Sequence, residues 1–261
     1  MNYEHLIVTP GPVATVVLNR PEARNAMSDV TLREAADAFL RLGQDRSVRA
    51  VIVTGAGKDF CAGADVAWMR RGGRLSGDEA EHDARLLAAM LRAVDECPAA
   101  VIVAAQGNVF GGGLGLLAAC DVALLAENAK LCFSECRLGI MPAVISCWVL
   151  PKIGSANARR WYLTAETFGA DSALAMGLAH EALPAAGLAA RAAELAAAVL
   201  KCGPEAVRAA KSALSTMGGL SPAEREEFAV STLLQLRSSP EGQEGLSAFL
   251  EKRAPKWAAK P

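Results

Sequence analysis

Apolar runs alternate with amphipathic segments over the first half of the chain. Residues 5–9 and 14–19 predict two strands around the turn Pro10–Pro12. The continuous apolar run Ala50–Thr54 is typical of a strand buried on both faces. Further strands are predicted at 99–105 and 121–125, with helices at about 29–43, 77–96 and 112–120; Ser28 or Asp29 can cap the first helix. Repeated strand–helix units predict an α/β core with mostly parallel strands.

The pattern becomes purely helical after residue 155. Helices are expected at about 155–163, 171–176, 189–202, 204–217, 222–236 and 240–252. Pro204 and Pro222 stand where helices begin, a position at which the missing N–H of proline costs little. We therefore expect a core over residues 1–195 and a helical C-terminal region over residues 196–261.

Composition and charge narrow the class of protein. Lys and Arg number 27 against 28 Asp and Glu, and apolar residues make up 52% of the chain. This balance argues against a surface built for nucleic acid or anionic membranes, and also against disorder. No apolar run reaches the roughly 18–20 residues of a membrane span, and the first residues show no secretory signal. We expect a cytoplasmic globular protein that binds neither nucleic acid nor membrane.

The cysteines do not predict a metal site. The chain has seven cysteines and three histidines, but no Cys-x-x-Cys pair. A zinc site needs about four N or S ligands at recognisable spacing. We interpret the cysteines as reduced and mostly packed as small apolar side chains, with neither disulfides nor metal.

Two glycine-containing turns carry most of the chemical information. They are residues 59–65 and 107–115, and each lies between a predicted buried strand and a predicted helix. Backbone N–H groups at a helix start are fixed donors, and glycine lets a ligand approach them closely. Two such groups can form an oxyanion hole for a thioester carbonyl, although either turn taken alone is better explained as an ordinary chain reversal. A dinucleotide fingerprint, a Walker motif and a hydrolase elbow are all missing.

Five segments spread over nearly the whole chain form a joint pattern: Leu18–Met27, Phe60–Asp65, Gly111–Gly113, Ala119–Asp121 and Glu244–Arg253. In order and approximate spacing they resemble the crotonase superfamily, the enoyl-CoA hydratase/isomerase family. The joint pattern is far more specific than any single glycine turn.

The resemblance implies a ββα-superhelix core, trimers or hexamers, and an acyl-CoA substrate without a further cofactor. It implies that the N–H groups of Ala62 and Gly112 hold the thioester oxygen. The implied substrate-binding residues are Arg24, Ala62, Gly63, Ala64, Asp65, Val66, Gly111, Gly112, Gly115, Phe249 and Lys252. Phe249 and Lys252 would reach the coenzyme A of a neighbouring subunit. An exposed loop arginine, a core aromatic and a solvated lysine are the plainer interpretations of Arg24, Phe249 and Lys252.

The sequence departs from the two-glutamate pattern of the hydratases in this family. The first glutamate position is Gly115, and the second is Glu135, which we predict to be the catalytic acid and base. A carboxyl group in an apolar pocket has a raised pKa, which suits proton exchange near neutral pH. One carboxylate is compatible with hydration, with Δ3,Δ2-enoyl-CoA isomerisation and with enolate stabilisation for decarboxylation.

Hydration is favoured by a second, weaker resemblance. Segments 113–116, 142–146 and 161–166 look like those of bacterial hydratases of 3-methylglutaconyl-CoA or isohexenylglutaconyl-CoA. Glycine at 115 would remove charge and bulk, so that a carboxylated, branched acyl chain enters. The alternatives are an isomerase and a non-catalytic acyl-CoA-binding scaffold. Trp68, Met69 and residues 70–83 are expected to shape the acyl pocket, because they follow the first turn.

Overall fold

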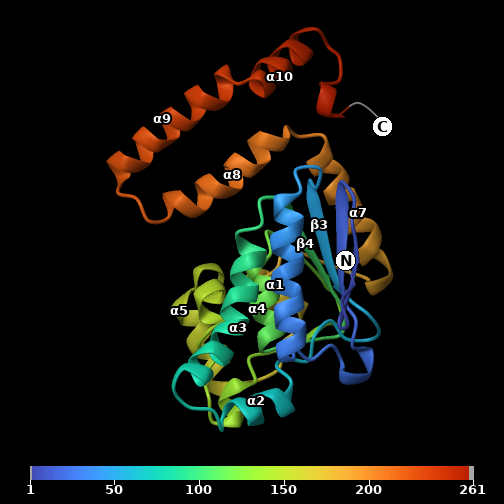
Figure 1. The fold of residues 1–261 in the computed structure, drawn as a ribbon, viewed down its shortest axis with the longest axis vertical. Coiled ribbons are helices and arrows are strands. Elements are labelled where there is room, and N and C mark those ends of the chain that lie inside the picture. Colours follow the sequence, from blue (N-terminus) through green and yellow to red (C-terminus); the bar gives the residue numbers. More distant parts are fainter. Residues whose placement is uncertain (1, 259–261) are drawn as a thin grey trace.

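A mostly parallel sheet forms the centre of the molecule (Figure 1). The structure is a computed structural model, and it describes residues 2–258. Its six strands are, in spatial order, β1 (Leu6–Thr9), β2 (Val13–Leu18), β3 (Ala50–Gly55), β4 (Ala100–Ala105), β6 (Val122–Ala126) and β8 (Glu181–Leu183). Only the β1–β2 pair is antiparallel. The predicted α/β class is confirmed, and β8 is an addition to the predicted strands.

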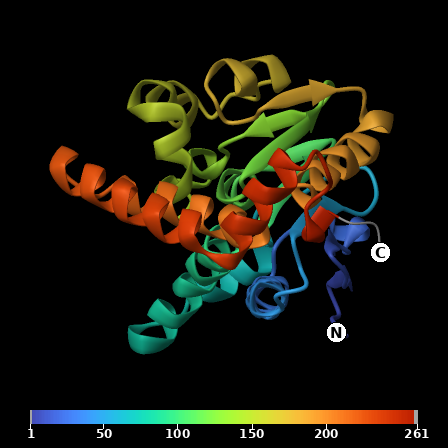
Figure 2. The same ribbon diagram turned by 90° about the horizontal axis from the view of Figure 1, so that it is seen from above.

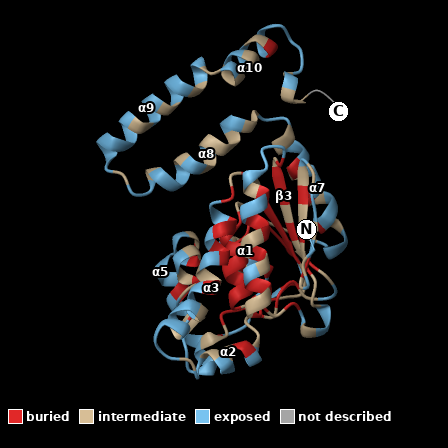
Figure 3. Ribbon diagram, viewed as in Figure 1, coloured by how far each residue is buried: buried red, intermediate tan, exposed pale blue. Residues whose placement is uncertain are grey.

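Helices cover the sheet on two sides (Figure 1). Helices α1 (Asp29–Gln44), α3 (Gly77–Asp95) and α4 (Gly112–Ala119) pack in sequence against one another, and α7 (Leu188–Leu200) lies against β3, β4 and β6. Helix α1 begins where the sequence predicts, because the Ser28 hydroxyl accepts the Thr31 N–H. The buried residues gather between these layers, while the far C-terminal helices are mainly exposed (Figure 3).

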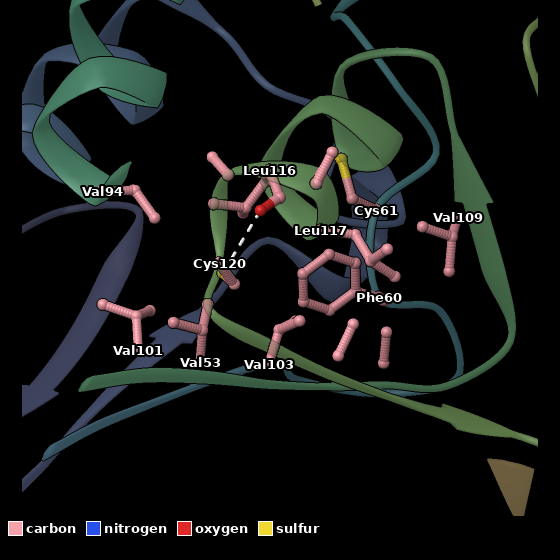
Figure 4. Close-up of a cluster of buried hydrophobic side chains, with 14 of the residues drawn as sticks. Val53, Phe60, Cys61, Val94, Val101, Val103, Val109, Leu116, Leu117 and Cys120 are labelled. Atoms are coloured by element: carbon pink, nitrogen blue, oxygen red, sulfur yellow. Dashed lines mark hydrogen bonds between the residues drawn. The ribbon is translucent and has the colours of Figure 1, made fainter. Parts of the chain in front are cut away.

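The core is built from the predicted apolar strands. Val53 of β3 and Val101 and Val103 of β4 pack beneath Leu117 of α4, with Phe60 alongside (Figure 4). All five residues are fully buried, at 0% exposure. Because α4 rests on this fully packed layer, its first turn has a fixed position.

A second, small sheet connects the two glycine turns. Strand β5 (Asn108–Phe110) pairs in parallel with β7 (Lys130–Cys132), and Cys61 bridges to Val109 on the other side of β5. The first turn, the second turn and the segment that leads to Glu135 therefore run side by side. These short strands were not predicted.

Helix α5 (Ser146–Thr164) begins nine residues before the predicted helix at 155. Gly154 interrupts it with a φ of 68°, so the predicted helix is its second half. The remaining helices are α2 (Val66–Gly72), α6 (Ala170–Ala175), α8 (Pro204–Met217), α9 (Pro222–Ser238) and α10 (Pro240–Leu250).

Helices α8, α9 and α10 extend away from the sheet (Figures 1 and 2). The base of this arm is attached to the core by Lys211 of α8, whose ammonium group lies 2.7 Å from the Asp121 carboxylate. Within residues 2–258, no helix has the length and apolar character needed to cross a membrane.

Candidate active site

A cavity of about 370 Å³ lies where the two glycine turns meet helix α2 and the segment after β7. Its walls are mainly apolar, and Glu135 is the only ionisable side chain among the described residues that line it. The lining residues are Ala62, Gly63, Ala64, Val66, Trp68, Met69, Ala84, Leu87, Gly111, Gly112, Ser134, Glu135, Leu138, Ile140, Met141, Pro142, Ala143, Val144 and Ile145.

Backbone hydrogen bonds hold the two turns together. The Phe110 N–H donates to the Cys61 carbonyl at 2.9 Å, and the Gly111 N–H donates to the Cys132 carbonyl at 3.0 Å. Gly113 is required by this close approach, since a Cβ there would lie 2.9 Å from the Cβ of Cys61. Gly111 has a φ of 46°, a left-handed conformation that favours glycine.

Two backbone N–H groups on the cavity wall have no acceptor within residues 2–258. Gly112 is the first residue of α4, so its N–H has no partner inside the helix. The backbone around Ala64 pairs with Met27, because the Met27 N–H donates to the Gly63 carbonyl and the Asp65 N–H donates to the Met27 carbonyl. The Ala64 N–H takes no part in this pairing. Both residues line the cavity, so each N–H is a hydrogen-bond donor available to a bound ligand.

The structure corrects the predicted role of Ala62. Its N–H donates to the Arg24 carbonyl at 3.0 Å, so this group is already occupied by the loop before α1. Ala62 still lines the cavity. The sequence could not predict that the Ala62 N–H is occupied, because this depends on which backbone groups of the turn face the loop.

Glu135 begins a short 3-10 helix, η2 (Glu135–Leu138), and lies against Gly111. Its Oε1 is 3.1 Å from the place where a Cβ on Gly111 would stand. Its Oε2 is buried and has no hydrogen-bond partner. Burial raises the pKa of Glu135 above its ordinary value, while a hydrogen bond from its own N–H acts in the opposite direction.

Comparison with known proteins identifies the family. Residues 9–260 match the enoyl-CoA hydratase/isomerase family. The chain belongs to this family. It is 33% identical over 264 residues to the crotonyl-CoA hydratase of Syntrophomonas wolfei, with 100% of both chains covered. It is 32% identical to a putative enoyl-CoA hydratase of Thermus thermophilus, covering 96% of this chain and 99% of the relative. The crystal structure of an enoyl-CoA hydratase from Shewanella pealeana superimposes with a TM-score of 0.93 at 35% identity, covering 97% of this chain and 96% of that one. The crotonase superhelix expected from the resemblance is thus confirmed.

Within this enoyl-CoA hydratase/isomerase framework, most residues predicted from the first turn are at the cavity. Gly63 and Val66 line it together with Ala64. Asp65 instead stabilises the wall, because its carboxylate caps α2 through the N–H groups of Ala67 and Trp68. The same carboxylate pairs with Arg20 at 3.2 Å.

Three predicted residues lie apart from the cavity in this chain. Arg24 is on the loop beside the first turn, with its side chain 70% exposed. Phe249 and Lys252 lie at the end of the C-terminal arm, at the opposite end of the molecule from α2 (Figure 1). Phe249 is 82% exposed, so it is not a core aromatic of the isolated chain.

Gly115 also fails to reach the cavity, and this removes the reason given for a branched, carboxylated substrate. The space beside Gly115 is filled by Ile145, which stands between that glycine and the cavity. Sequence reasoning missed Ile145, because it belongs to a loop 30 residues further along the chain.

Trp68 and Met69 line the cavity as expected. The indole N–H of Trp68 donates to the Asp83 carboxylate at 2.7 Å, which joins α2 to α3 beside the cavity.

Proposed function

We propose that this protein adds water across the α,β double bond of an acyl-CoA thioester. The N–H groups of Ala64 and Gly112 hold the thioester oxygen, and Glu135 is the single acid and base. The proposal is supported by the family and by the cavity in which these three groups lie.

The reaction balances with one carboxylate. Ionised Glu135 takes a proton from water while the water oxygen bonds to the β-carbon. The electrons of the double bond move onto the thioester oxygen, where Ala64 and Gly112 stabilise the enolate. The enolate then collapses, and Glu135 returns the proton to the α-carbon. The hydroxyl and the proton of one water are thus both transferred to the substrate.

The observation that carries this proposal is the unpartnered Oε2 of Glu135 in an apolar cavity. A buried carboxylate oxygen without a donor costs stability, so such an arrangement is typical of a catalytic group. Its raised pKa brings protonated and ionised forms closer in population near neutral pH, which general acid–base catalysis requires.

Product analysis by mass spectrometry tests the proposal. Wild type and Glu135→Gln are incubated with crotonyl-CoA in isotopically labelled water. We expect wild type to yield a product heavier by one labelled water and the variant to yield almost none. Equal, negligible turnover by both proteins, with crotonyl-CoA still bound, would instead support a non-catalytic scaffold.

Isomerisation is the second candidate, favoured by one specific observation. No second ionisable side chain lines the described cavity, so no other carboxylate is present to hold a water. A single carboxylate suffices to move a proton between the α- and γ-carbons of a Δ3-enoyl-CoA. In the same assay, a product of unchanged mass with a shifted double bond would identify this reaction.

The cavity wall also indicates an uncharged acyl group. A carboxylated chain, such as the glutaconyl type, would bring a second negative charge beside Glu135, and no cation lines the described cavity to balance it. We therefore expect pentanoyl-CoA to bind at least about tenfold more tightly than glutaryl-CoA, which titration calorimetry can measure. Equal affinities would restore the glutaconyl-type substrate.

We further infer that the C-terminal arm associates with other copies of the chain. Val230, Leu233 and Leu234 of α9, like Phe249 and Leu250 of α10, are more than half exposed in the single chain. Apolar surface of this kind is typical of an interface. Light scattering should give the mass of a trimer or hexamer, and the role of Phe249 and Lys252 toward a neighbour's coenzyme A depends on that assembly.

A further inference from the structure

Gly115 and Ile145 fit together as a pair. A Cβ at Gly115 would stand 2.5 Å from Cγ2 of Ile145, 3.0 Å from its Cβ and 3.3 Å from a methyl group of Leu91. Ile145 is 2% exposed, so it has little room to withdraw. The glycine therefore does not enlarge the cavity, and Ile145 provides the wall at this point.

This wall lies beside the carbons that would react. Gly111 precedes the first residue of α4, and the Gly115 N–H donates to its carbonyl at 3.2 Å, so the two glycines lie one turn apart. The first contacts Glu135 and the second contacts Ile145, so the carboxyl group and the aliphatic side chain are neighbours along the cavity. In the proposed reaction the acyl oxygen lies at Gly112 and the α-carbon at Glu135, so the β-carbon extends along the cavity that Ile145 also lines.

We propose that Ile145 is a specificity-determining residue, which restricts the cavity to acyl groups without a branch at the β-carbon. The inference rests on the proposed function, because it requires an acyl-CoA in this cavity. A methyl branch at the β-carbon would occupy the place of the Ile145 side chain, which is held from behind by α4.

Steady-state kinetics of Ile145→Ala and Ile145→Val test this role. Crotonyl-CoA is compared with 3-methylcrotonyl-CoA, and the measured quantity is the ratio of kcat/KM for the branched over the unbranched substrate. We expect Ile145→Ala to raise this ratio at least about tenfold, since one methyl group is worth about 10–200-fold in discrimination. Ile145→Val should lie between Ile145→Ala and wild type.

Val144→Ala is the matched control, because it shortens the adjacent cavity side chain, whereas the nearest neighbours of a Cβ at Gly115 are Ile145 and Leu91. Its ratio should remain that of wild type. An unchanged ratio in Ile145→Ala, or an equal rise in Val144→Ala, would overturn the role of Ile145.

Binding measurements separate this inference from the proposed reaction. Titration calorimetry with butyryl-CoA and 3-methylbutyryl-CoA needs no turnover, and the same tenfold shift in relative affinity is expected for Ile145→Ala. If wild type binds these ligands but hydrates nothing, the proposed reaction fails while the shift still decides the role of Ile145.

Thermal unfolding tests the pairing itself and does not depend on substrate. Gly115→Ala should lower Tm by about 5 °C, because its methyl group overlaps Ile145. Adding Ile145→Ala should recover part of this loss. Additive losses in the double variant would show that the two positions are independent.

Discussion

Replacing Glu135 by glutamine should separate activity from stability. The side chains have nearly the same shape, but glutamine carries no charge and cannot exchange a proton with the substrate. General acid–base catalysis contributes about 10²–10⁴-fold to rate, so kcat should fall by that factor, or about 3–5 kcal/mol in activation free energy.

Stability should move in the opposite direction. In wild type, the buried Oε2 of Glu135 has no hydrogen-bond donor, and an unsatisfied buried polar group costs on the order of 1–3 kcal/mol. Burial penalises the charged form most, as the raised pKa of Glu135 indicates. Glu135→Gln removes that charge, so its free energy of unfolding should equal or exceed that of wild type at neutral pH.

The pH dependence follows from the direction of the pKa shift. Between the unfolded and the raised folded pKa of Glu135, the folded state binds more protons than the unfolded state. This group therefore makes wild type less stable as pH rises through that interval. The stability advantage of Glu135→Gln should be absent at pH values below the unfolded pKa and reach a plateau above the folded pKa.

Denaturant unfolding at several pH values, alongside crotonyl-CoA turnover, measures both effects. Asp83→Asn is a suitable control, because it removes a carboxylate near the cavity but keeps an acceptor for Trp68. A Glu135→Gln variant that loses stability at neutral pH, or that retains most of its activity, would refute the reasoning.

Three further predictions concern residues around the core. Burial raises the pKa of Cys61 to about 12 and also raises that of Cys120. In the native state we therefore expect a thiol reagent to modify only the three exposed thiols, Cys136, Cys147 and Cys202, and in denaturant all seven. Early reaction of a fourth thiol would show that the core opens. Lys211→Met should lower the free energy of unfolding by about 2 kcal/mol in a denaturant titration, because it leaves the half-buried Asp121 without its cation. Adding Asp121→Asn should recover part of this loss. Asp83→Ala should raise KM for crotonyl-CoA severalfold with a smaller change in kcat, because Trp68 on the cavity wall loses its hydrogen-bond acceptor. Asp83→Asn keeps an acceptor and should behave like wild type. A pure loss of kcat would contradict this positioning role.

The long elements of the fold follow from the sequence pattern, and the short ones do not. Continuous apolar runs correctly predicted β3 and β4, and the serine cap correctly predicted the start of α1. Strands β5, β7 and β8 have three residues each, too few for a periodic pattern. They exist because their backbone groups pair with distant segments, and a local sequence window does not contain that information.

The same distinction applies to the candidate site. Glu135 and Gly112 could be selected by motif position, and both lie on the cavity. The choice between Ala62 and Ala64 could not be made in this way, because it depends on which N–H bonds to the Arg24 carbonyl and which has no acceptor among residues 2–258. Ile145 could not be found either, because its contact with Gly115 joins a loop to a helix through packing alone.

The packing around Gly115 explains why this glycine leaves no hole beside the cavity. Gly115 lies on α4, and Leu117 of the same helix packs near the buried Val53 and Val103 of the sheet, so the backbone cannot move to fill the space (Figure 4). A neighbouring side chain fills the space instead, and Ile145 takes that place. The cavity wall that Ile145 forms at this point is aliphatic. In the proposed reaction, which uses Glu135 alone, this aliphatic surface would determine which acyl groups reach the carboxyl group.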